Sequence, residues 1–271
     1  MTIKGTYPVI NWPSSICELN NLPLDQREAI YRTLIPDWLY TRYGVDPLTL
    51  TANGHKVVQF QFAAGSRAAE ITVKRRAEDL DPMLYLNIAD TFNNQIIVLM
   101  LIANDPEAPR FNTDVDQHGN ATSFGTSGRN KPAELAALAA GLAPGQVRRG
   151  LRFFRAALPL FAQFVQRLGH DMFLIEPLAY HNAIMFERYG FGYIRGQRDM
   201  AQIHADFQPG GALHSKLSPD KPFQQPAAWK TVRGRSWAIH DGILGHPFTG
   251  FQMYRLIDRS LHVNTFPDAV W

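Results

Sequence analysis

The alternation of apolar and polar residues predicts two β-hairpins in the first half of the chain. One covers residues 58–73, where apolar side chains recur at every second position on both sides of Gly65. The other covers residues 83–104. Its second arm, residues 96–102, is almost wholly apolar, which is typical of a central strand buried on both faces.

A helical period marks three further segments. Residues 21–44 predict a helix or a helix pair, which Pro36 kinks or divides and Gly44 ends. The alanine-rich residues 133–143 favour a helix by propensity. From Gln146, after a Pro-Gly break, apolar residues at helical spacing predict a long amphipathic helix.

The segment after the long helix predicts a strand, a helix and a second strand. The sequence DMFLIE reads as a short buried strand, HNAIMFERYG as a helix that Gly190 ends, and FGYIRG as the last clear strand. Strands that alternate with helices imply a partly parallel sheet with crossover connections. We therefore expect an α/β fold.

The remainder of the chain changes character. Residues 200–271 hold glycine, proline, histidine and aromatic residues without a sustained period. Their apolar content is too high for a solvated tail, so we expect a C-terminal extension packed on a domain of residues 1–199 or on a second subunit, as in a homodimer. The large apolar residues of the extension are Trp229, Trp237, Phe248, Phe251, Tyr254, Leu256 and Phe266.

Composition narrows the classes of protein. A single cysteine, Cys17, excludes an internal disulfide framework and suits a reducing, cytoplasmic location. We expect no signal peptide and no membrane span, because no apolar run approaches about 20 residues. The formal net charge of +3 is spread out, apart from one arginine cluster. That distribution suggests a small anionic ligand and no nucleic acid.

The arginine cluster stands at the predicted start of the long helix, in APGQVRRGLRFF. Helix N-termini carry partial positive charge and usually attract acidic residues. Arg148, Arg149 and Arg152, with Gly150 for close approach, favour a bound phosphate or pyrophosphate there. Arginines on a solvated face, or paired with acids elsewhere, are the structural alternative.

Two segments resemble the motifs of the GNAT superfamily of acyl-CoA-dependent N-acyltransferases. Pro144 and the basic run resemble its CoA-binding loop and helix. HNAIMFERYGFGY resembles its second motif. The resemblance implies a mixed, partly parallel GNAT-like sheet flanked by helices, and acetyl-CoA or another acyl-CoA as cosubstrate. The residues it assigns to the cofactor are Val147, Arg148, Arg149, Gly150, Leu151, Arg152, Asn182 and Phe186.

The same resemblance implies a small-molecule amine or a peptide as acyl acceptor. Glu176 then ends a strand at the cleft and acts as base, directly or through water. His181 is a base or an acid, and Tyr180 or Tyr189 replaces the tyrosine that many members carry where Phe186 stands. The structural alternative has Glu176 paired with an arginine and His181 bonded to the backbone.

Two other classes of function stay open. One is a GNAT-like module that binds a ligand or partner without catalysis, since both motifs depart from the family pattern. The other is a metal site that uses His240, Asp241 and His246, which lie close together in HDGILGH. That spacing matches no established ligand pattern.

Overall fold

The computed structural model describes residues 12–122 and 128–271, which form a mixed α/β fold with mostly antiparallel strands. The chain divides into two compact units. Unit 1 comprises Met1–Ala103 and Arg152–Phe173, and unit 2 comprises Asn104–Leu151 and Leu174–Trp271. The boundary that the sequence suggested, after residue 199, falls inside unit 2.

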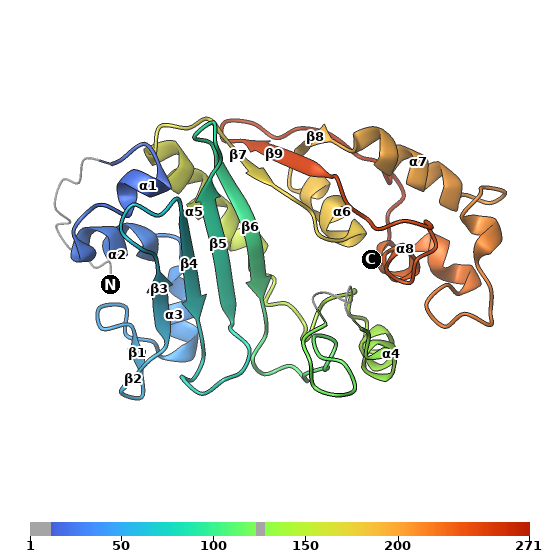
Figure 1. Ribbon diagram of the computed structural model, residues 1–271, viewed down its shortest axis with the longest axis horizontal. Coiled ribbons are helices and arrows are strands. Elements are labelled where there is room, and N and C mark those ends of the chain that lie inside the picture. Colours follow the sequence, from blue (N-terminus) through green and yellow to red (C-terminus); the bar gives the residue numbers. More distant parts are fainter. Residues whose placement is uncertain (1–11, 123–127) are drawn as a thin grey trace. The chain divides into compact units, whose positions relative to one another are not determined.

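Unit 1 is built on four antiparallel strands that follow one another in chain order (Figure 1). The strands are β3 (Val58–Gln61), β4 (Ala68–Val73), β5 (Leu84–Asp90) and β6 (Ile96–Ala103). Both predicted hairpins are therefore confirmed. A separate two-stranded ribbon joins β1 (Thr51–Ala52) to β2 (His55–Lys56).

The alternation along the strands sorts the side chains onto two faces. In β4 every second residue is buried, at Ala69, Ile71 and Val73, while the residues between them are half-buried. β5 repeats the pattern. Because successive side chains of a strand point to opposite faces, the buried set forms a single core face.

Helices of unit 1 contribute to this core. They are α1 (Ile16–Leu19), α2 (Leu24–Arg32), α3 (Asp37–Tyr43) and α5 (Phe154–Arg167). Tyr31 of α2 stacks near Phe60 of β3, with ring centroids 6.3 Å apart, and lies 6.4 Å from Phe164 of α5. The buried Asp90 carboxylate accepts from the N–H groups of Ile16 and Cys17, both at 2.8 Å, and so satisfies donors at the start of α1.

Of the single helix and the helix pair that the sequence left open, the structure has the pair, α2 and α3. Pro36 is the N-cap of α3, where its missing N–H costs no helical hydrogen bond. Gly44 caps the other end with φ of 63°, the left-handed conformation that glycine adopts without strain.

Strand β6 departs from the expectation of burial on both faces. Its first three residues are buried, but Leu99 is 44% exposed and the residues after it are half-buried. The register with β5 shifts between Asn87 and Ile88, which pair with Met100 and Val98, so Leu99 has no partner residue on β5. This irregularity is a β-bulge, a feature that redirects side chains and is common beside functional sites.

The start of the long helix was predicted wrongly. α5 begins at Phe154, eight residues after Gln146, and its N-cap is Phe153. The preceding segment consists largely of turns and bends, with one isolated bridge at Gly150, and Arg152 adopts a φ of 54°. A residue with a φ in the left-handed region cannot continue a right-handed α-helix. Arg148 and Arg149, which precede Arg152, therefore lie outside the first turn of α5.

Unit 2 contains the strand–helix–strand segment that the sequence predicted. β7 (Met172–Ile175), which crosses the unit boundary, precedes α6 (Tyr180–Arg188) and β8 (Gly192–Arg195). Gly190 follows the helix with φ of 78°, as expected of a helix stop. The remaining helices are α4 (Lys131–Ala139), α7 (Gln197–Phe207), α8 (Val232–His240) and the short 3₁₀ turns η1 (His214–Lys216) and η2 (Pro226–Lys230).

A further strand, which the sequence did not make clear, follows β8. β9 (Gln252–Leu256) pairs antiparallel with β8 and lies between β7 and β8 in the strand order. The C-terminal extension thus supplies a strand to unit 2. It also supplies α8, whose Trp237 is buried and stacks on Phe223 with ring centroids 5.2 Å apart.

Candidate functional site

The arginine-rich loop before α5 is fixed through its backbone. The carbonyl oxygen of Val147 accepts from the N–H of Phe111, and that of Arg149 accepts from the N–H of Asp105, both at 2.8 Å. Gly150 forms an isolated antiparallel bridge. The loop is therefore held by backbone contacts beside the segment that follows β6.

The guanidinium groups of this loop have different environments. Arg148 is half-buried, and its Nη1 donates to the carbonyl oxygen of Ala108 at 2.5 Å. Arg149 and Arg152 are exposed, and neither forms an ion pair with any residue that the structure describes. Leu151 between them is half-buried. The two exposed charges are available to an anion from solution.

Arg152 is held in an unfavourable backbone conformation. Its φ of 54° lies in the left-handed region, which costs a non-glycine residue of order 1–2 kcal/mol. Conformations of this kind persist where the surrounding structure fixes them, and they concentrate at functional sites. The turn at Arg152 leads the chain from this loop into α5.

Glu176 follows β7 directly and is exposed. Its Oε1 lies 3.4 Å from Nε2 of Gln252, the first residue of β9. This contact is long for a hydrogen bond and leaves the carboxylate open to solvent. The structural alternative, a pair with an arginine, is not formed among the described residues.

His181 lies in the interior of unit 2. It is 6% exposed, and its Nδ1 lies 2.9 Å from Oγ of Ser236 on α8. Burial, followed by the positive charges of Arg233 and His240, lowers the pKa of His181 from 6.5 to about 3. The imidazole is therefore neutral at physiological pH.

Tyr180 is likewise buried, at 1% exposed. Nη1 of Arg235 lies 3.5 Å from its hydroxyl oxygen, and its ring meets Phe248 edge-on with centroids 6.3 Å apart. Burial raises the pKa of Tyr180 to about 12, although the Arg235 charge acts in the opposite direction. The phenol thus keeps its proton at neutral pH.

The two α6 residues assigned to the cofactor differ in exposure. Asn182 is half-buried, and its backbone N–H bonds to the carbonyl oxygen of Ala179, the N-cap of the helix. Phe186 is buried, with its ring centroid 5.2 Å from that of Phe191. Phe186 therefore contributes to the packing of α6.

Two of the predicted catalytic residues, Tyr180 and His181 of α6, pack against α8, and the third, Glu176, is exposed to solvent. Tyr180 meets Arg235, and His181 meets Ser236, both through α6–α8 packing. Sequence reasoning missed both α8 residues. No local signal identifies them, because Arg235 and Ser236 lie 55 positions from their partners.

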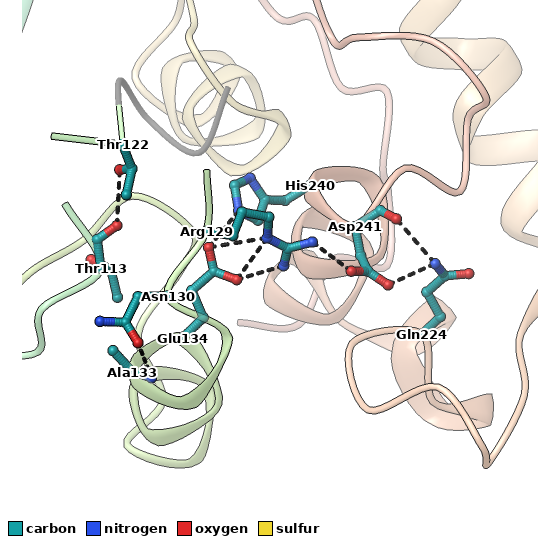
Figure 2. A network of polar contacts seen from close by, with 9 residues as sticks. All are labelled: Thr113, Thr122, Arg129, Asn130, Ala133, Glu134, Gln224, His240 and Asp241. Atoms are coloured by element: carbon teal, nitrogen blue, oxygen red, sulfur yellow. Dashed lines mark hydrogen bonds and ion pairs between the residues drawn. The ribbon is translucent and has the colours of Figure 1, made fainter. Parts of the chain in front are cut away.

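A second polar network joins α4 to the end of α8 (Figure 2). The Glu134 carboxylate, 3% exposed, accepts from Nη2 of Arg129 at 2.5 Å and contacts Nε2 of His240 at 3.1 Å. Arg129 also pairs with Asp241 at 2.6 Å, and Gln224 donates to the same carboxylate at 2.8 Å. These groups satisfy one another, which is the arrangement expected of a structural contact.

The metal hypothesis gains no geometric support. His240 and Asp241 contact different partners, and exposed His246 bonds to the backbone oxygen of Pro247. In residues 12–122 and 128–271, histidine, cysteine and acidic residues form no group of three or more suited to a metal ion.

Comparisons of the chain with protein-family models, with curated proteins and with solved structures found no match. In the part of the chain that the structure describes, every helix is too short or too polar to cross a bilayer.

Proposed function

We propose that the protein is a GNAT-like N-acyltransferase that uses acetyl-CoA or another acyl-CoA. The observation that carries the proposal is the loop before α5. Its backbone is fixed, and it presents half-buried Arg148 and exposed Arg149, and Arg149 has no carboxylate partner among the described residues. A pyrophosphate is the anion that such a run of guanidinium groups suits best.

The fold is compatible with this function. β7, α6 and β8 follow one another in the chain, and β9 lies between β7 and β8 in the strand order. The exposed Glu176 carboxylate, directly after β7, therefore lies beside Gln252 at the start of β9. The bulge of β6 at Leu99 belongs to unit 1 and interrupts an otherwise regular ladder. Bulges and strand ends are common positions for binding groups.

Acyl transfer requires two groups from the protein, a base for the acceptor amine and a proton donor for the leaving thiolate. The thioester of an acyl-CoA supplies an activated acyl group. Exposed Glu176 takes the proton of the acceptor amine, directly or through water, as its nitrogen attacks the thioester carbon. The carbon–sulfur bond then breaks, and the leaving thiolate takes up a proton. Tyr180 is protonated at neutral pH and so has a proton to donate to the thiolate. Because its side chain is buried, the packing around it must change before it reaches the thiolate.

The second candidate is a module that binds an acyl-CoA or a related anion without turnover. The burial of both Tyr180 and His181 favours it, because neither side chain meets solvent. Binding of CoA with no acyl transfer to any amine would select this candidate.

A charge-matched pair of variants tests the arginine loop. Changing Arg148 and Arg149 to Ala removes the proposed pyrophosphate contacts, and CoA should bind at least about tenfold more weakly, since hydrogen bonds to charged groups contribute about 1.5–3 kcal/mol each. The control changes Arg75 and Arg76 to Ala, which alters the net charge equally in unit 1. Equal CoA affinity in the two double variants, measured by calorimetry, would assign the cluster another role.

A further inference from the structure

Three polar side chains of unit 2 form a row across the strands β7, β9 and β8. Glu176 directly follows β7, Gln252 begins β9, and Arg195 ends β8. Oε1 of Glu176 lies 3.4 Å from Nε2 of Gln252. Gln252 is also the partner residue of Arg195 across the antiparallel β8–β9 pair. Because β9 lies between β7 and β8, the amide of Gln252 separates a carboxylate from a guanidinium group.

A shift of register in β8 turns Arg195 toward this row. Tyr193 pairs with Met253. The next pair joins Arg195 to Gln252, so Ile194 has no partner residue on β9. The Tyr193 hydroxyl donates to a glutamate of α6 at 2.6 Å, and in a regular strand Arg195, two residues later, would share that side. Opposite residues of an antiparallel pair share a face, and Gln252 and Met253 point to opposite faces, so the bulge directs Arg195 away from α6.

The two charges at the ends of the row are open to solvent. Glu176 and Arg195 are exposed, and neither forms an ion pair with a residue of the described ranges. Strands β7 and β8 are two strand spacings apart, about 9.5 Å. The row therefore offers acceptors for a cation at one end and donors for an anion at the other.

An exposed apolar side chain stands near each charge in the chain. Leu178, two residues after Glu176, is 52% exposed, and Ile194, next to Arg195, is 47% exposed. Binding sites for small molecules combine apolar surface with a few polar groups that fix the orientation of the ligand. These side chains therefore favour a ligand that carries hydrocarbon as well as both charges.

We propose that this row binds an α-amino acid with an apolar side chain. Its ammonium group contacts the Glu176 carboxylate, and its carboxylate contacts the Arg195 guanidinium. Charge-assisted hydrogen bonds of about 2.8 Å at both ends leave the few ångströms that separate the two groups on an α-carbon. The inference rests on the proposed function for the role of the ligand, because contact with Glu176 makes its amine the acyl acceptor. The binding itself needs no CoA.

Titration of the full chain with L-leucine at neutral pH, without CoA, tests the site. Two analogues each lack one charge: isopentylamine has no carboxylate, and isocaproate has no ammonium group. Nuclear magnetic resonance of the ¹⁵N-labelled protein follows binding through the backbone amides of Arg195 and Gln252. L-leucine should bind at least about tenfold more tightly than either analogue, because each analogue loses one charge-assisted contact.

Two variants assign the charges of the ligand to the two ends of the row. Arg195→Gln should remove the preference for L-leucine over isopentylamine, and Glu176→Gln should remove the preference over isocaproate. Both side chains are exposed, so neither change disturbs the core. The control, Arg198→Gln, removes an exposed charge on α7 of the same unit and should leave both preferences unchanged.

The proposal fails if L-leucine binds no more tightly than either analogue, or if either preference survives in its variant. The outcome is separable from that of the proposed function. Binding of CoA without binding of L-leucine would refute this inference alone, and binding of L-leucine without binding of CoA would refute the acyl transfer alone.

Discussion

At the scale of single residues, environment decides which groups are able to do chemistry. Glu176 and His181 are five positions apart, yet the carboxylate is exposed while the imidazole is buried against Ser236. A histidine titrates near pH 6.5 only where both of its protonation states are accessible. His181 is therefore better suited to fix α6 on α8 than to exchange protons during turnover.

This view predicts a pH dependence of stability. The folded pKa of His181 is about 3 and the unfolded value is 6.5. Between them the unfolded state binds the extra proton, so the contribution of this group is complete above pH 6.5 and is lost as the pH falls toward 3. At pH 5.5 the loss should be about 1.4 kcal/mol.

Urea unfolding of wild type and His181→Gln from pH 7.5 to 5.5 measures this effect. The amide of glutamine keeps a polar partner for Ser236 but does not titrate, so the variant should show the smaller pH slope. Parallel slopes in the two proteins would mean that His181 is accessible to protons in the folded state.

At the scale of elements, close backbone approach fixes the end of the β8–β9 pair. Gly196 follows β8 with φ of 96°, and a Cβ there would lie 2.4 Å from Cδ1 of Phe251. The Phe251 ring in turn stacks on Phe248 with centroids 4.0 Å apart. A side chain at this position meets both a strained backbone and an occupied space.

Gly196→Ala should therefore destabilise the protein more than Gly250→Ala. Both glycines have positive φ, 96° and 84°, but nothing lies within 4 Å of a Cβ at Gly250. Both substitutions carry the cost of an alanine at positive φ. The difference between their free energies of unfolding therefore measures the clash with Phe251, about 1–3 kcal/mol for overpacking. Equal melting temperatures of the two variants would show that the ring moves aside freely.

The same scale shows how far the sequence predicts this structure. Strong alternation in β4 and β5, Pro36 and Gly44 around α3, and Gly190 after α6 are local signals that neighbouring atoms dictate, and the structure follows them. The long helix starts later than its apolar period suggests, because Arg152 takes a left-handed turn that propensity does not reveal.

Long-range partners explain the other misses. β9 has the mixed sequence QMYRL and becomes a strand by pairing with β8, some 60 residues earlier in the chain. The positions of Tyr180 and His181 depend on α8, which no local pattern connects to α6. The sequence therefore identified candidate residues by their chemical type but did not predict which of them are buried.

At the scale of the whole molecule, the C-terminal extension is part of unit 2. It contributes β9 beside β8 and α8 beside α6. The buried Glu187 carboxylate accepts from the N–H and the hydroxyl of Thr265 at 2.8 Å and 2.6 Å, which fixes the final segment as well.

Truncation after Met200 should therefore unfold unit 2. The shortened chain loses the partners of Tyr180, His181 and Glu187 together, and it should become protease-sensitive between β7 and β8. Removal of Trp271 alone, which is 37% exposed, is the control and should leave the fold intact. A soluble, fully folded monomer of residues 1–200 would contradict this assignment.

The central claim is that the chain binds an acyl-CoA, and thermal unfolding with and without acetyl-CoA tests it most directly. A ligand present at about 100 times its Kd adds about 2.7 kcal/mol to stability, which shifts the melting temperature by several degrees. The account predicts such a shift in wild type and in the Arg75/Arg76 variant, and its loss in the Arg148/Arg149 variant. No shift in wild type with millimolar acetyl-CoA or any longer acyl-CoA would contradict the account.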